Sequence, residues 1–373
     1  MSTSPVRRRS ALGLERLEAR DVPSFSPFQN PGGLSVAVGD VFPEQAGAPQ
    51  NEIIVGSGPG ELPYVRVYSL TGTLEAEFLA YEPTFRGGVN VAVANVNVDE
   101  GAGAGLGTAD LNEIITGTGP GGGPVVKVFN PNGRTVFRQF LAYESTFRGG
   151  VNVAGGQMNT ATPEDEVVTG AGFGGGPVVR VFNQNGSAFS SFFAYESSFR
   201  NGVNVAVGDA ITVGAAGANT GDEIVTGPGE GGSPLLKIFD EIGGLRRSFF
   251  AFDFQLRTGL VVAVGNTDGG QISSDNVFAA SQFTPLTQDI RVRSFNGNTN
   301  GQIESDFVAF PAGYTRYINL ASGEVGLDPT VPFIFQVPLN SGDFVAVAGE
   351  GPTAQSPFIE FGGVGSAAGN NGP

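Results

Sequence analysis

The feature that most constrains this chain is a segment that it repeats. Four copies are recognisable, at residues 78–92, 140–154, 192–206 and, more loosely, 249–263. The Val-Asn-Val-Ala-like string that ends this segment recurs more often than the whole segment does. One residue of each such string serves as a marker, and successive markers lie 52 to 62 residues apart. The markers are Val36, Val91, Val153, Val205, Val262 and, in a more divergent copy, Leu320. Such internal repetition indicates one small structural unit that is used several times.

Each unit contains four short runs rich in Val, Ile, Phe and Tyr. In one unit these are residues 203–207, 222–226, 236–239 and 249–253. Gly, Pro and Asn bound the runs, and no stretch has a sustained helical period, so the runs are predicted to be strands. Four strands in a repeat of about 50 residues are typical of a β-propeller blade. We therefore predict an all-β, six-bladed β-propeller of four-stranded antiparallel blades; a stacked β-solenoid is the alternative.

The two ends of the chain bear on how the ring closes. The last unit has three recognisable strands and stops before an aromatic fourth strand, whereas an aromatic run at residues 24–28 precedes the first unit. We predict that this N-terminal strand completes the sixth blade and closes the ring; a loose linker is the alternative. The expected organisation is a disordered basic or sorting segment at 1–23, one propeller at 24–363 and a flexible tail at 364–373.

Composition excludes several classes of function. The chain has no Cys and no His, which removes Ser-His-Asp and Cys-His catalysis and the commonest zinc ligand. The net charge of −16 disfavours nucleic acid and anionic membrane surfaces as partners. No apolar run is long enough for a transmembrane helix. Loop acids such as Asp99, Asp209 and Asp240 show no feature that marks a glycosidase pair. We therefore expect no enzyme.

Two loop types contain candidate binding residues. Asn95, Asn97 and Asp99 alternate on the loop after one inner run, as oxygen ligands do in calcium loops, although only one of them is a carboxylate. They are the candidate calcium site, residues 266–269 keep part of the same pattern, and ordinary polar turns are the alternative. The glycine loop at 117–124 contains a Gly-x-Gly-x-x-Gly pattern, but it joins two strands rather than opening a helix, so we expect no nucleotide cofactor.

Charged residues also repeat with the unit. Glu144 and Arg148 recur at the same spacing in other copies, and we interpret them as ion pairs that brace a turn. A cation recurs in the third run of five units, at Arg66, Lys127, Arg180, Lys237 and Arg291. Because an active site occurs once and these residues recur from unit to unit, the interpretation is architectural.

Two patterns carry a resemblance to a known family. Residues 14–20 resemble the Leu-Glu-x-Leu-Glu-x-Arg sorting motif near the N-terminus of many planctomycete surface proteins. The repeated Glu-Ile-Ile-Thr-Gly and Gly-Gly-Pro-x-Val-x-Val-Phe strings resemble FG-GAP/VCBS-like propeller repeats, over residues 32 to about 310. The resemblance implies export and a propeller of six or seven blades, and it says little about the ligand.

Together these observations predict a secreted or cell-surface propeller, acidic overall, that acts as a non-catalytic interaction or adhesion scaffold. Its expected partner is a protein or polysaccharide of the cell envelope. The variable loops at 94–111 and 209–221 are the expected contact elements, because loops on a rigid scaffold carry specificity. The alternatives are a glycan-binding lectin, which would need aromatic platforms, and a polysaccharide-cleaving enzyme.

Overall fold

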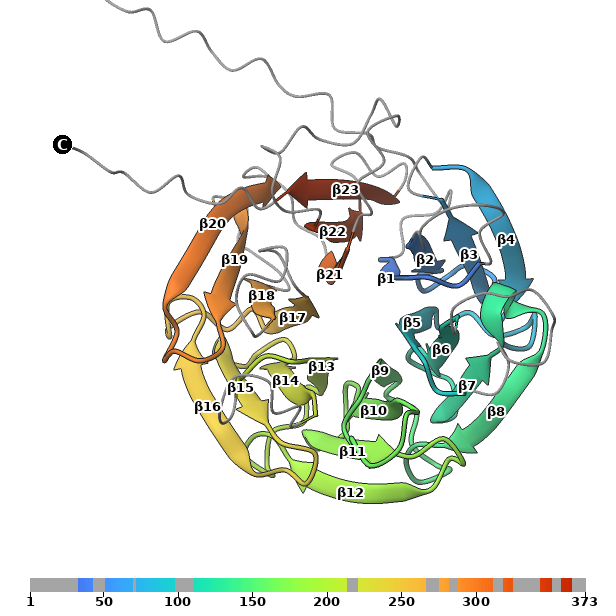
Figure 1. The fold of residues 1–373 in the computed structure, drawn as a ribbon, viewed down its shortest axis with the longest axis horizontal. Coiled ribbons are helices and arrows are strands. Elements are labelled where there is room, and N and C mark those ends of the chain that lie inside the picture. Colours follow the sequence, from blue (N-terminus) through green and yellow to red (C-terminus); the bar gives the residue numbers. More distant parts are fainter. Residues whose placement is uncertain are drawn as a thin grey trace, which may run out of the picture.

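The fold is a ring of antiparallel β-sheets around a central axis (Figure 1). The computed structural model describes residues 33–42, 51–69, 72–97, 111–212, 221–265, 275–281, 288–310, 318–324, 343–350 and 357–363. In these residues the chain forms strands and one 3₁₀ turn, η1 (Pro131–Gly133). No helix in these ranges has the length and apolarity to span a bilayer.

Each sheet runs outward from the axis in chain order. The innermost strands are β1 (Ser35–Gly39), β5 (Val89–Ala94), β9 (Val151–Gly156), β13 (Val203–Gly208), β17 (Leu260–Gly265) and β21 (Ile318–Glu324). The second strands are β2 (Glu52–Gly56), β6 (Glu113–Thr118), β10 (Glu166–Ala171), β14 (Glu223–Pro228), β18 (Asn276–Ser281) and β22 (Asp343–Glu350). The third strands are β3 (Tyr64–Tyr68), β7 (Val125–Phe129), β11 (Val178–Phe182), β15 (Leu235–Phe239), β19 (Ile290–Asn296) and β23 (Pro357–Gly363). The outer strands are β4 (Leu74–Leu79), β8 (Val136–Leu141), β12 (Ala188–Phe193), β16 (Leu245–Phe250) and β20 (Ile303–Phe310).

The propeller of four-stranded antiparallel blades is confirmed, but the predicted count of six such blades is wrong. Five sheets have four strands, and we number them blades one to five in chain order. A three-stranded sheet, β21-β22-β23, follows them, and β21 lies beside β1 (Figure 1). The strand expected to complete a sixth blade, residues 24–28, lies outside the described residues. So do the predicted terminal segments 1–23 and 364–373.

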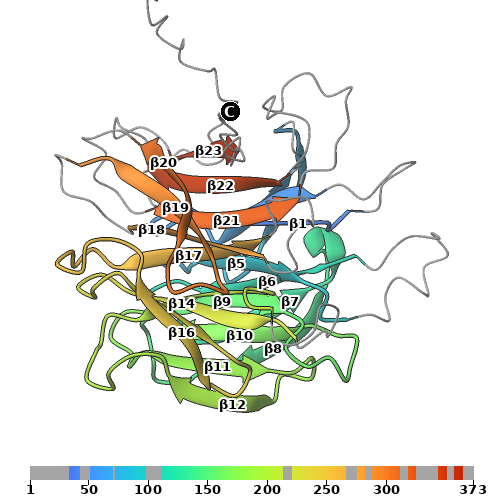
Figure 2. The same ribbon diagram turned by 60° about the vertical axis from the view of Figure 1, so that its left-hand side comes forward.

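The sequence of each strand reflects its distance from the axis. All six residues of β10 are buried, because blades pack against both of its faces, and its sequence accordingly does not alternate between apolar and polar residues. In β11 buried residues alternate with partly exposed ones, and in β12 most residues are exposed. Figure 2 shows the sheets from another side, with β12 at the periphery of the ring.

Aromatic side chains fill the space between neighbouring blades near the periphery. Phe140 of β8 packs against Phe182 of β11 in the next blade, with ring centroids 4.6 Å apart. The same pairing recurs as Phe78 with Phe129, Phe192 with Phe239 and Phe249 with Phe295. Tilted aromatic pairs at such distances add to the free energy gained by burying the rings. The repeated phenylalanine of the outer run is therefore a packing residue between blades.

Candidate ligand-binding groove between blades

The turn that links one blade to the next is closed by its own arginine. In the turn after β8, the Arg148 guanidinium donates hydrogen bonds to the carbonyl oxygens of Ser145 (2.6 Å) and Phe147 (2.8 Å). Arg200 and Arg257 make the equivalent bonds in later turns. The predicted pairing of Glu144 with Arg148 is therefore wrong in its partner, although the arginine does brace the turn. The guanidinium carries several N–H donors in one plane, so it can bond two neighbouring carbonyl oxygens at once.

The partner of Glu144 comes instead from the next blade. Arg180 of β11 donates from Nη2 to Glu144 Oε1 at 3.1 Å and from Nη1 to the Ala142 carbonyl at 2.7 Å. Its guanidinium lies 5.1 Å from the centroid of the Tyr143 ring, a cation–π contact. The cation thus ties blade three to the end of blade two.

The other third-strand cations follow this pattern, with one correction. Lys127, Lys237 and Arg293 donate to the matching carbonyls of Ala80, Ala194 and Ala251. In blade five the bridging residue is therefore Arg293, and the predicted Arg291 pairs with Asp306 of its own sheet at 2.6 Å. Arg66 likewise pairs within its sheet, with Glu77.

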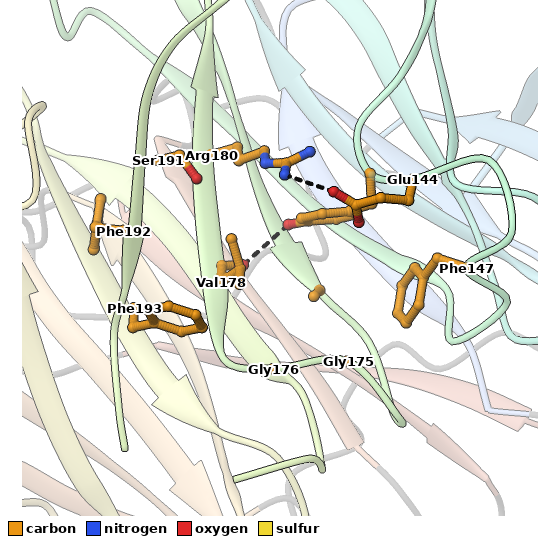
Figure 3. Close-up of a pocket in the computed structure, with 11 residues that line it drawn as sticks. Glu144, Phe147, Gly175, Gly176, Val178, Arg180, Ser191, Phe192 and Phe193 are labelled. Carbon is orange, nitrogen blue, oxygen red and sulfur yellow. Dashed lines mark hydrogen bonds and ion pairs between the residues drawn. The ribbon is translucent and has the colours of Figure 1, made fainter. Parts of the chain in front are cut away.

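A groove lies where the turn of blade two meets the face of blade three (Figure 3). Antiparallel pairing places Val178 opposite Phe193 and Arg180 opposite Ser191, and all four side chains line the cavity. Phe147, from the turn, lines the other side, and the cavity volume is about 330 Å³. That volume is at the lower end of the range for small-molecule sites, roughly 300–1,000 Å³.

Two glycines keep the groove open between its two phenyl rings. A Cβ on Gly175 would lie 3.0 Å from the Phe147 ring, and a Cβ on Gly176 would lie 3.2 Å from the Phe193 ring. Both distances are shorter than ordinary van der Waals contact, so any larger residue would crowd the rings. Figure 3 shows Phe147 and Phe193 on opposite sides of this glycine segment.

The charges in the groove are balanced. A hydrogen bond from its own backbone N–H and the contact with Arg180 lower the pKa of Glu144, so its carboxylate is ionised at neutral pH. Tyr143 is buried, which raises the pKa of its hydroxyl, and that hydroxyl bonds to Thr169 Oγ1 and the Val178 carbonyl. The groove therefore offers a carboxylate, a guanidinium and two phenyl rings, and no acid or base that is poised for proton transfer near pH 7.

The neighbouring blade junctions carry related but different residues. Between blades one and two the matching positions hold Phe85, Lys127, Gln139 and Leu141. Between blades three and four they hold Phe199, Lys237, Ser248 and Phe250, with Ser233 in place of Gly176. Among the ion pairs of the described residues, only the junction of blades two and three joins the turn glutamate to the third-strand cation.

The central channel is a second cavity, of about 70 Å³. Its wall includes the asparagine of each repeated Val-Asn-Val string, and these side chains bond across blades. Asn152 Nδ2 donates to the Val203 carbonyl (2.8 Å) and to Asn204 Oδ1 (3.1 Å). Asn90 and Asn204 donate in the same way to the carbonyls of Val151 and Leu260. Since its amides are engaged and its volume is that of about two water molecules, this cavity has little room for a ligand.

The candidate calcium residues are only partly described. Asn95 and Asn97 lie just after β5, where their backbone N–H groups donate to Asp165 Oδ2 (2.8 Å) and Glu113 Oε2 (3.0 Å). Asp99 lies outside the described residues, so the calcium loop stays a prediction. In the described ranges no three acidic, His or Cys side chains are grouped as a metal site. Most of the predicted contact loops, 98–110 and 213–220, also lie outside those ranges.

Carboxylates at the start of the second strands proved more important than the sequence suggested. Asp222 Oδ2 accepts a hydrogen bond from the Gln157 backbone N–H of the preceding blade, and Glu223 Oε2 accepts one from Ile211 within its own blade. Burial, partly offset by these bonds, raises the pKa of each carboxyl to about 7, with nearby acids adding to the shift. The sequence signal was the glutamate that opens each of these second runs, preceded by Asp in two of them, at Asp165 and Asp222. The strand pattern gave no reason to place Asp222 at a blade junction.

Comparison with known proteins shows likeness at the level of the fold. No protein-family model matches the sequence, and no curated protein matches it. Among solved structures, BBS1N in complex with ARL6DN is 10% identical, with a TM-score of 0.47 over 91% of this chain and 96% of that one. The rhamnogalacturonan lyase YesW is 13% identical, with a TM-score of 0.41 over 93% and 61%. The biofilm matrix protein Bap1 of V. cholerae is 13% identical, with a TM-score of 0.36 over 78% and 42%. At these values the likeness carries no argument about function.

Proposed function

We propose that this protein is a non-catalytic interaction scaffold, exported to the cell surface or beyond, whose perimeter binds a protein or polysaccharide of the cell envelope. The observation that carries the proposal is a row of exposed apolar side chains at one repeat position of the outer strands. These are Leu79 (37% exposed), Leu141 (51%), Phe193 (56%) and Phe250 (50%). Each of these blades thus exposes an apolar side chain at the same position of its outer strand, and the proposal takes this repeated set as the binding surface.

The remaining chemistry agrees with a scaffold. The buried carboxylates Glu113, Glu166 and Glu223 each accept a backbone N–H bond from the loop after the inner strand of the same blade, so they hold that loop in place rather than face a substrate. A chain without His or Cys also lacks the usual nucleophile and base pairs. The sorting-type segment near the N-terminus supports export. The acidic net charge favours solubility and argues against nucleic acid as the partner.

Binding to isolated cell envelopes tests the proposal. A triple variant with Leu79, Leu141 and Phe250 changed to Ser should lose at least tenfold in saturable binding, because the apolar row is interrupted without touching the core. A matched control changes the exposed turn residues Thr84, Ser145 and Ser197 to Ala and should bind as the wild type does. Equal binding by all three proteins would reject the perimeter as the contact surface.

An assay of polysaccharide cleavage addresses the enzymatic alternative. Purified protein incubated with envelope polysaccharide should release no new reducing or unsaturated ends. Reproducible release that co-purifies with the folded protein would overturn the non-catalytic assignment.

A further inference from the structure

We infer that the groove between blades two and three binds a neutral pyranose unit, held by stacking against Phe193 and Phe147 and by hydroxyl contacts to Glu144 and Arg180. The inference rests on the proposed scaffold function and names a ligand class for one site on it.

The apolar half of the groove suits a flat ligand. The Phe193 side chain is 56% exposed even though Val178 lies beside it across the strand pair, so a face of its ring is open to solvent. Phe147 is half-buried against Gly175 on the other side. The face of a phenyl ring is its electron-rich part, and it attracts the weakly positive C–H groups that line one face of a pyranose.

The polar half supplies both kinds of hydrogen-bonding group that hydroxyls need. The Glu144 side chain is 74% exposed, and its ionised carboxylate accepts hydrogen bonds only. Arg180 has five N–H donors. Among the described residues, it uses one to bond Glu144 (Figure 3) and one to bond the Ala142 carbonyl. Ser191, opposite Arg180, is exposed and adds a hydroxyl that can donate or accept.

Charge argues for a neutral ligand over an ionic one. The charges of Glu144 and Arg180 balance each other within the groove, at a distance of 3.1 Å. An anion bound to Arg180 would be repelled by Glu144, and a cation bound to Glu144 would be repelled by Arg180. A ligand with several uncharged hydroxyls can use the acceptor and the donors together. Half the lining is apolar, which a small hydrated ion could not use.

Backbone chemistry argues against an extended peptide as the occupant. A peptide gains affinity on a sheet mainly by adding main-chain hydrogen bonds at a free edge. On the floor of this groove, the Val178 carbonyl accepts the Tyr143 hydroxyl and the Val178 N–H donates to the Gly176 carbonyl. The Gly175 N–H donates to Gly172. The floor therefore has few main-chain groups to offer, and recognition has to use side chains.

Affinity electrophoresis through gels that contain a neutral glucan, galactan or mannan tests the inference. At least one neutral polysaccharide should retard the wild-type protein, and Phe193→Ala should weaken that retardation at least tenfold. Gly176→Ser should also weaken retardation, because a side chain at this position would crowd the Phe193 ring. Serine is the residue that the next junction has at the same position, Ser233. The matched control is Phe189→Ala, which removes another exposed phenyl ring of β12 that does not line the groove, and it should leave retardation intact.

Other outcomes separate this inference from the proposed function. If no neutral polysaccharide retards the wild type while envelope binding persists and is destroyed by protease treatment of the envelopes, the groove assignment fails and the scaffold with a protein partner stands. Equal loss in Phe193→Ala and Phe189→Ala would also overturn it, because the effect would then not be specific to the groove. Circular dichroism and thermal melts of each variant check folding, and Glu144→Gln, an exposed change, replaces any variant that does not fold.

Discussion

The hydroxyl of Tyr143 lies 3.1 Å from Oγ1 of Thr169 and 3.0 Å from the carbonyl oxygen of Val178, and so joins the end of blade two to two strands of blade three. Tyr81 and Tyr195 make the same contact with Thr116 and Thr226. In the next copy Phe252 takes the place of the tyrosine, and Ala279 takes the place of the threonine. The copy that lacks the tyrosine hydroxyl therefore also lacks the threonine hydroxyl that it would bond.

This relationship predicts the stability of the Tyr143→Phe variant. Loss of the hydroxyl should lower the free energy of unfolding by about 1–2 kcal/mol, since two hydrogen bonds at a buried site disappear. The double variant Tyr143→Phe, Thr169→Ala reproduces the natural Phe252 and Ala279 combination and should lose less than the sum of its two single changes. Urea unfolding at pH 7 measures all three. Strict additivity would show that the two residues are not coupled.

The asparagines of the inner strands should contribute to stability in a similar way. Asn152→Ala removes hydrogen bonds to the Val203 carbonyl and to Asn204, and we expect the free energy of unfolding to fall by about 1–2 kcal/mol. Gln184→Ala, an exposed change on a loop, is the control and should stay within about 0.5 kcal/mol of the wild type. Equal unfolding midpoints for the two variants would mean that the amide ladder does not hold the ring together.

The glycine opposite Asn152 should tolerate no side chain. A Cβ on Gly170 would lie 2.3 Å from the Val203 carbonyl oxygen of the next blade, so Gly170→Ala should destabilise the protein by about 1–3 kcal/mol. At Gly123 the nearest neighbour of a Cβ is a methyl group of Val125 at 3.9 Å, and Gly123→Ala should be neutral or slightly stabilising. Thermal melts of both variants provide the comparison, and a harmless Gly170→Ala would mean that the blades can move apart freely.

The buried carboxyl groups predict that stability falls as pH rises. Asp222 and Glu223 have pKa values of about 7 in the folded protein, whereas unfolded carboxyls titrate near 4. The folded state therefore binds more protons between about pH 4 and pH 7, and the free energy of unfolding decreases through that window. The wild type should melt at a higher temperature at pH 5 than at pH 8.

Asp222→Asn isolates the contribution of one carboxyl. The amide oxygen can still accept the Gln157 N–H, and the buried charge is removed, so this variant should gain about 1 kcal/mol or more at pH 8 and depend less on pH. Glu82→Gln, a change at an exposed position, should leave the wild-type pH dependence in place. Melting temperatures that rise from pH 5 to pH 8 in the wild type would contradict the assignment.

Much of the fold was predictable because its signals are local. The alternating and continuous apolar runs predicted the strands, and the repeat predicted the propeller. The count of four-stranded blades was not predictable, since residues 24–28 had to be assigned to a sheet that lies more than 300 positions away in the chain. The pairing of Glu144 with Arg148 failed for a related reason: spacing indicated a partner within the turn, whereas Arg180 arrives from the next blade.

By itself the sequence determined the repeating unit, the order of strands within a blade and the absence of His and Cys chemistry. These depend on residue type and on neighbours within a few positions. Only the tertiary structure decided what the repeated residues do. Asn152, Tyr143 and Arg180 each bond across a blade boundary, and Gly170 is small because the carbonyl that Asn152 bonds lies against it. In blade five Val261 and Ala280 replace that asparagine and glycine together. The two residues change together because the distance between neighbouring blades decides what fits between them. That distance is set by the packing of the ring and not by the local sequence.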